Sequence, residues 1–219
     1  IRHRPALQSA LHRDNDLGKE GALWCPGDVG GVNIDAPVAA DPESGILYVP
    51  SRSHCSTRVI APGKERDKLI AEPTGSTIAE YAVLRGFGIR PPNNLPIFKP
   101  PFSRITAIDM NSGEHLWMIP AGETPSRVMN HPKLAGIDVP RTGSGLPPSL
   151  LVTRTLVIYA STTSDDTPAL FAVDKATGVE VGKVEVERMS RYGMMTYQHQ
   201  SRQYVVLQTG SVLTSLALP

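Results

Sequence analysis

The apolar residues of this chain fall into short runs bounded by Gly, Pro, Asn, Asp and Ser, with little helical periodicity. Runs of this length and composition predict β-strands. The expected strands cover residues 46–50, 105–109, 115–119, 155–161, 170–173, 179–186, 203–208 and 212–218, with one short helix near 77–86. Several of these runs flank a glycine-containing turn, as 105–109 and 115–119 do, so they predict hairpins. The pattern therefore predicts an all-β architecture.

An internal repeat accounts for two of these hairpins. Residues 105–117 match residues 170–182 at an offset of 65, with Ala, Asp and Gly recurring in register. The aspartate ends a strand and can bond the turn backbone, while the glycine supplies the positive φ that the return requires. The first copy ends in Trp117, a side chain large enough to cover the gap between units, whereas the second has Gly182 there. Repeats of this kind stack into propellers or solenoids.

Composition narrows the classes of function. The chain has 219 residues, 20 Pro, 19 Gly and a net charge of +1, without a basic stripe, so nucleic acid is not an expected partner. There is no apolar run of about 18 residues that could span a membrane and no signal segment. Because the sequence opens with Ile1, it is either processed or begins inside a longer chain. Cys25 and Cys55 can either pair in an oxidising compartment or remain free buried thiols.

The chain is expected to form one partial propeller domain over residues 1–219, interrupted by a Pro/Gly-rich insertion at about 61–103. That stretch contains the runs 91–94 and 100–101, whose prolines favour loops over core strands. Loops of this length are usually functional or mobile.

The repeat and several other stretches resemble the pyrroloquinoline-quinone (PQQ) dehydrogenase family. The matching stretches are 107–117, 26–33 with 41–49, 143–148 with 156–161, 195–197 with 202–206, and 215–219. Residues 107–117 are similar to the tryptophan-docking motif that locks adjacent blades of the family's eight-bladed propellers. The resemblance implies an all-β propeller of which this chain is the C-terminal three to four blades. It is strongest to the membrane-bound glucose dehydrogenase type.

The resemblance also implies a function, cofactors and partners. A protein of this type oxidises a sugar, alcohol or polyol in the periplasm with PQQ and calcium, and passes electrons to a ubiquinone-type acceptor. The remaining propeller blades, on the same parent chain or on a partner subunit, are the expected protein partner. Asn33 matches the asparagine that hydrogen-bonds the quinone, and Gly30 and Gly31 would let the backbone approach it. The alternative for Asn33 is a residue that only satisfies turn backbone.

Two departures support a second hypothesis, a non-catalytic propeller scaffold that has lost its cofactor. Asn33 is followed by Ile34 where the family has Trp, and the glycine-rich loop near the end is cut to residues 209–211. The family's catalytic Asp, its calcium ligands and the Trp under the quinone come from earlier blades. We therefore assign no catalytic residue and no metal ligand to this chain.

Other polar residues have simpler interpretations. Asp109 and Asp174 occupy the same place in the repeat, which favours turn stabilisation over an acid–base pair. The histidines share no motif, so a metal site built from them is not expected. No nucleophile elbow or acid pair supports a hydrolase or lyase.

Overall fold

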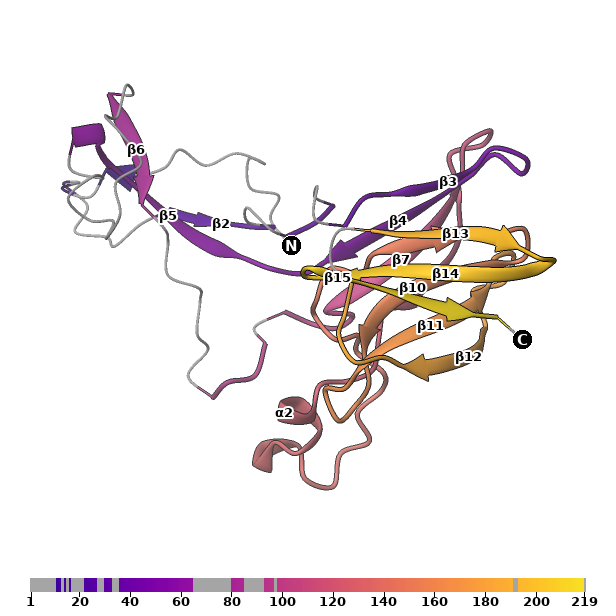
Figure 1. The fold of residues 1–219 in the computed structure, drawn as a ribbon. Coiled ribbons are helices and arrows are strands. Elements are labelled where there is room, and N and C mark those ends of the chain that lie inside the picture. The colour runs from indigo at the N-terminus through magenta and orange to yellow at the C-terminus, as the bar shows by residue number, and fades with distance from the viewer. Residues whose placement is uncertain are drawn as a thin grey trace. The chain divides into compact units, whose positions relative to one another are not determined.

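The computed structural model describes residues 11–12, 14, 16, 22–26, 30–32, 36–64, 80–84, 93–96, 98–190 and 193–218. The chain divides into two compact units (Figure 1). The first unit comprises residues 1–30 and 54–90, and the second comprises 31–53 and 91–219. Each is described by itself. In the described part, no helix is long and apolar enough to cross a membrane.

The first unit contains one sheet built around β5 (Ser56–Pro62). This strand pairs in parallel with β1 (Leu11–His12) and antiparallel with β2 (Ala22–Trp24) and β6 (Tyr81–Leu84). The helix predicted near 77–86 is therefore wrong for residues 81–84. Tyr and Val favour strands, and the hydrogen bonds to β5 outweigh a weak local helical preference.

The first sheet of the second unit is a four-stranded antiparallel meander. Its order is β3 (Ala39–Asp41), β4 (Ile46–Arg52), β7 (Ser103–Asp109) and β8 (His115–Pro120). The excursion between β4 and β7 does not change the pairing, because β4 pairs with β7 along its whole length.

Two further meanders follow in the second unit. The second sheet contains β9 (Leu150–Val152), β10 (Leu156–Thr162), β11 (Pro168–Asp174) and β12 (Glu180–Glu185). The third sheet contains β13 (Met194–His199), β14 (Arg202–Thr209) and β15 (Val212–Ala217). Helix α2 (Ser126–Met129) and a 3₁₀ turn (Pro132–Leu134) lie between the first and second sheets in sequence. The predicted strands are confirmed at β4, β7, β8, β10, β11, β12, β14 and β15, whereas β3, β9 and β13 were not predicted.

The internal repeat is confirmed by strand register. Ala107 pairs with Trp117, and the register shifts immediately after Ala107. Ala172 pairs with Gly182, and the register shifts immediately after Ala172. The two hairpins therefore share a β-bulge at the same repeat position, which a chance similarity of turns does not explain.

Apolar side chains between the sheets form two cores. Tyr48, Ile105, Tyr159 and Phe171, all fully buried, lie in the core between the first and second sheets. Ile158, Leu170, Val205 and Leu207 belong to the core between the second and third sheets. Because side chains alternate along a strand, the middle sheet buries both of its faces.

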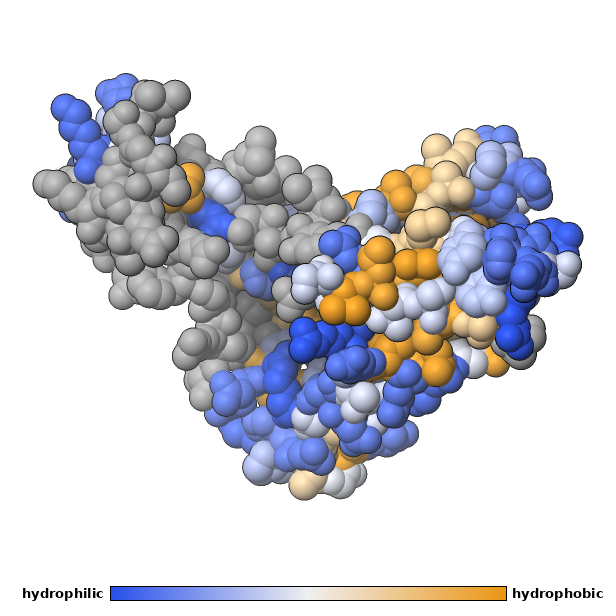
Figure 2. Space-filling view, viewed as in Figure 1, coloured by the Kyte–Doolittle hydropathy of each residue, from blue (hydrophilic) through white to orange (hydrophobic). Residues whose placement is uncertain are grey.

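The two outer faces of this stack remain apolar and exposed. On the third sheet, Met195 is 55% and Leu213 72% exposed. Tyr197 stacks on Tyr204 on the same face, with ring centroids 5.0 Å apart. On the first sheet, Met118 is 52% exposed on the face opposite Trp117. Figure 2 shows apolar side chains gathered over β13–β15, as expected of a surface that receives a partner.

Candidate functional site

The predicted cofactor loop lies around Gly30 and Gly31. Gly31 has φ +66° and forms an isolated β-bridge with Arg52, with N···O distances of 2.8 and 3.1 Å. A positive φ is costly for residues with a Cβ, so the turn itself requires glycine. Asn33 lies outside the described residues, and its contact with a cofactor stays a prediction.

Gly30, in the first unit, is required by close backbone packing. A Cβ built there would lie 1.6 Å from the Pro26 carbonyl oxygen and 2.9 Å from that of His54. This approach explains the glycine without any ligand. The predicted contact between Gly30 and a cofactor therefore rests on the resemblance alone.

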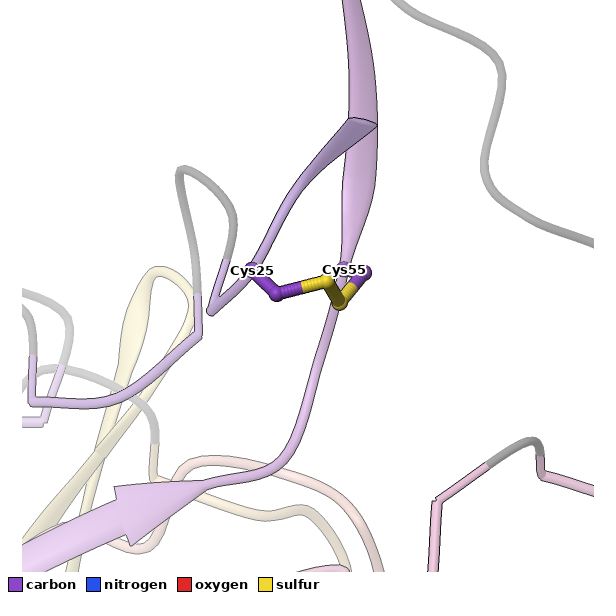
Figure 3. Close-up of a disulfide and its surroundings, with 2 residues drawn as sticks. All are labelled: Cys25 and Cys55. Carbon is purple, nitrogen blue, oxygen red and sulfur yellow. A yellow bond between two sulfur atoms is a disulfide. The ribbon is translucent and has the colours of Figure 1, made fainter. Parts of the chain in front are cut away.

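A disulfide fixes the strand pair beside Gly30. Cys25 and Cys55 are bonded, with Cα atoms 4.5 Å apart, and link the end of β2 to the start of β5 (Figure 3). Of the two possibilities that the sequence left open, the structure has the paired one. The bridge closes a loop of 30 residues, a constraint of the size that typically stabilises a fold by about 3 kcal/mol.

Two buried polar atoms on this strand pair have no hydrogen-bond partner among the described residues. They are Nε1 of Trp24 and Oγ of Ser56. The two residues are directly paired across β2 and β5, so their side chains share one face. Both groups can donate, and a buried donor left unpaired costs about 1–3 kcal/mol. These two donors therefore remain available to a group that accepts hydrogen bonds. Sequence patterns could not reveal them, because an unpaired donor is defined by its tertiary surroundings.

Asp109 and Asp174 stabilise turns, as the repeat predicted. Asp109 Oδ1 accepts from the Asn111 amide at 2.8 Å, and Asp174 Oδ1 accepts from the hydroxyl and the amide of Thr177, both at 2.9 Å. These bonds lower the pKa of both carboxyls below the usual value, so both stay ionised at neutral pH. Each carboxylate serves its own turn, and the pair does not form an acid–base site. Among the described residues, no cluster of His, Cys, Asp or Glu has a geometry that could hold a metal.

Lys175 connects the first and second sheets. Its carbonyl accepts from Trp117 Nε1 and from the Tyr48 hydroxyl, each at 3.1 Å, and its Nζ lies 2.5 Å from Asp41 Oδ2. Asp41 and Lys175 are 134 residues apart in sequence, and no local sequence pattern predicts this ion pair. Ser44 also donates to the Asp41 carboxylate, at 2.6 Å.

Arg141 connects the same two sheets at another point. Its guanidinium donates to the Gly122 carbonyl at 2.7 Å and pairs with Glu180 at 2.7 Å. The same group lies 5.3 Å above the Phe171 ring and contacts the Tyr159 hydroxyl, whose pKa is raised to about 12 by burial. Lys175 and Arg141 thus join side chains to main chain across one interface.

The Asp41–Lys175 pair makes a pH-dependent contribution to stability. The hydrogen bond from Lys175, helped by Ser44, lowers the pKa of Asp41 from 3.8 to about 2. A carboxyl whose pKa is lower in the folded state stabilises the fold at pH values above its unfolded pKa. It loses that contribution as the pH falls through the folded pKa.

Asp41→Asn should therefore lower the free energy of unfolding clearly at pH 5, as measured with urea. The difference in unfolding free energy between this variant and wild type should shrink as the pH falls from about 4 to about 2. Glu43→Gln, in the same turn and exposed, is the control and should show no such trend. A difference that stayed constant with pH would contradict this assignment.

The comparisons with known proteins agree with this architecture. The family model of the glucose/ethanol/alcohol dehydrogenase β-propeller domain, designated PQQ, matches residues 13–205. Among curated proteins, none matches the chain. A crystal structure of quinohemoprotein alcohol dehydrogenase from Comamonas testosteroni is similar over 86% of this chain and 23% of that one, with a TM-score of 0.51 and 18% identity. The predicted all-β propeller fold is thereby confirmed, and the chain spans less than a quarter of that neighbour's length.

Proposed function

Because the chain belongs to the PQQ family of glucose/ethanol/alcohol dehydrogenase β-propeller domains, we propose that it is the C-terminal propeller part of a PQQ-dependent dehydrogenase. The observation that carries the proposal is the match over residues 13–205 on three stacked meanders, the first two of which share the repeat register. The proposed substrate is a sugar, alcohol or polyol, and the proposed acceptor is a quinone of the ubiquinone type. The motif stretches of the sequence favour the membrane-bound glucose dehydrogenase type within this family.

The residues of this chain would bind and orient the cofactor. When bound, PQQ supplies the oxidising quinone, and calcium supplies the charge that polarises it. The Asn33 amide offers a donor and an acceptor to ring oxygens. The base that receives the substrate's proton and the calcium ligands would come from the rest of the propeller.

The proposed protein partner is the rest of that propeller. Both outer faces of the three-sheet stack are apolar, and large residues such as Leu213 remain 72% exposed there. Further blades, on the same parent chain or on a partner subunit, would cover these faces in the manner of the two observed cores. The Cys25–Cys55 disulfide supports a periplasmic location, because disulfides persist in oxidising compartments.

A non-catalytic scaffold is the second candidate. The observation that favours it is the tight hairpin between β14 and β15, where Thr209 pairs with Val212 and Gly210 has φ +74°. So short a turn gives the third sheet no long loop there. A protein that keeps the interlocking sheets and lacks cofactor contacts would serve as an interaction module.

Equilibrium PQQ binding to the intact protein with calcium distinguishes the two candidates. Asn33→Ala should weaken binding by about tenfold, the effect of losing one hydrogen bond of roughly 1.4 kcal/mol. Trp117→Phe is the control, because its N–H already bonds the Lys175 carbonyl, and binding should be unchanged. A folded, intact protein that does not bind PQQ would contradict the dehydrogenase proposal and favour the scaffold.

A further inference from the structure

A polar groove lies where the β9–β10 turn meets the β13–β14 hairpin. It has a volume of about 590 Å³, within the range of small-molecule sites, and its described lining consists of threonines, glutamines, one arginine and one tyrosine. Thr196 pairs with Val205, which belongs to the core between the second and third sheets, so this face of the hairpin points toward the second sheet. Both walls of the groove are therefore supplied by sheets that already pack together.

The β9–β10 turn fixes the backbone of Arg154 at one wall of the groove. The Thr153 N–H donates to the Leu156 carbonyl at 2.8 Å, and the Thr153 hydroxyl accepts from the Leu156 N–H at 3.0 Å. The Thr155 carbonyl accepts from the Lys175 N–H at 3.0 Å, which ties this turn to the adjacent one. Arg154 itself is exposed and has no ion-pair or hydrogen-bond partner among the described residues. Its guanidinium is therefore available to a ligand.

The opposite wall presents two glutamine amides. Gln203 Nε2 donates to the Thr196 hydroxyl at 2.9 Å, and that hydroxyl donates to the Tyr204 carbonyl at 2.8 Å. These bonds orient the Gln203 amide and leave its Oε1 without a partner in the described part of the chain. Gln198 pairs directly with Gln203 across the hairpin, so its amide lies on the same face. The wall thus offers an acceptor from Gln203 and both a donor and an acceptor from Gln198.

The charge of the groove favours an anion. Arg154 is the only charged residue of the described lining, and no carboxylate there neutralises it. A guanidinium presents its donors in a planar fork that matches a carboxylate or a phosphate. The Gln203 acceptor requires a donor, however, and an ionised carboxylate has none. A ligand that carries both a carboxylate and hydroxyl groups satisfies the two walls together.

We propose that this groove binds a small hydroxylated carboxylate, such as a sugar acid. The carboxylate would pair with Arg154, and hydroxyl groups, which both donate and accept, would bond the amides of Gln198 and Gln203. Neither Gly30 nor Gly31 lines the groove. The site is therefore separate from these two positions of the predicted cofactor loop, and the proposal does not depend on the dehydrogenase assignment.

Calorimetric titration of the intact protein with gluconate tests this proposal. Gluconate should bind saturably. Sorbitol, which lacks the carboxylate, and propionate, which lacks the hydroxyl groups, should each bind at least about tenfold more weakly. Absence of saturable gluconate binding would overturn the proposal. Propionate or inorganic phosphate that bound as tightly as gluconate would also overturn it, because the groove would then select negative charge alone.

Substitution of Arg154 tests the carboxylate contact. Arg154→Gln should weaken gluconate binding by about ten- to hundredfold, and Arg154→Lys, which keeps the charge and loses the fork, should weaken it less. Arg202→Gln is the matched control and should leave binding unchanged. Arg202 is exposed on the same hairpin, but it pairs with His199, one position beyond Gln198, so it faces the other side of the sheet. Equal effects of Arg154→Gln and Arg202→Gln would contradict the proposed site.

Hydrogen–deuterium exchange locates the ligand on the intact protein. Saturating gluconate should slow the exchange of amides in residues 153–156 and 196–203 and leave those of residues 111–113, in the β7–β8 turn, unchanged. Protection elsewhere without protection of these two segments would overturn the proposal. PQQ binding measured on the same preparation separates the two proposals, because a protein that binds gluconate here and no PQQ contradicts the dehydrogenase assignment alone.

Discussion

Phe171→Ala should lower the free energy of unfolding by about 3–5 kcal/mol, the usual loss for truncating a buried aromatic side chain. Phe171 is fully buried on β11, stacks on Tyr159 with ring centroids 5.1 Å apart, and lies beneath the Arg141 guanidinium. Its removal leaves a cavity between the first and second sheets and deprives Arg141 of its aromatic contact. Urea unfolding of the intact protein measures the change.

Two control variants make this prediction specific. Phe171→Leu keeps most of the apolar volume and should cost clearly less than the alanine variant. Val179→Ala, at a position that is 63% exposed, should change stability by no more than about 0.5 kcal/mol. A Phe171→Ala loss below about 1 kcal/mol would mean that this interface does not stabilise the fold.

Gly178→Ala should destabilise the protein by about 2–4 kcal/mol, well beyond the cost of its backbone conformation. Gly178 has φ +73°, so any residue with a Cβ is strained there, and the new methyl group would also collide with Trp117. The Trp117 ring would have to shift, which would weaken the hydrogen bond from its Nε1 to the Lys175 carbonyl.

The repeat supplies the matched control for this variant. Gly113 has φ +76° in the corresponding turn, and a Cβ there meets no atom within 4 Å. Gly113→Ala should therefore lower the free energy of unfolding by only about 1 kcal/mol, the cost of holding a residue with a Cβ at a positive φ. The difference between the two variants isolates the Trp117 contact, and tryptophan fluorescence should change in Gly178→Ala alone. Equal losses would show that packing of Trp117 on Gly178 contributes little.

The sequence predicted those parts of the fold that are determined by residues close together in the chain. The hairpins after residues 109 and 174 follow from an aspartate and a glycine at fixed spacing, and both appear with the expected hydrogen bonds. Strand β6 was mistaken for a helix because its partner β5 is distant in sequence and decides its conformation.

The contacts that join the sheets had no sequence signal. Lys175 meets Asp41 across 134 residues, and Arg141 reaches Tyr159 and Glu180 from a loop. The candidate site likewise contains residues that a sequence motif indicated and residues that only the tertiary structure brings out. Gly30 and Gly31 stood out as a motif, whereas the unpaired donors of Trp24 and Ser56 emerge only once β2 and β5 are paired.

The most direct test of the dehydrogenase assignment is PQQ-dependent turnover by the intact protein. PQQ and calcium would be added to the apoprotein, with reduction of an artificial dye followed for a panel of sugars, alcohols and polyols. The account predicts dye reduction that saturates with PQQ, requires one substrate class and weakens in Asn33→Ala at subsaturating PQQ. A folded protein that neither binds PQQ nor reduces the dye with any of these substrates would contradict it.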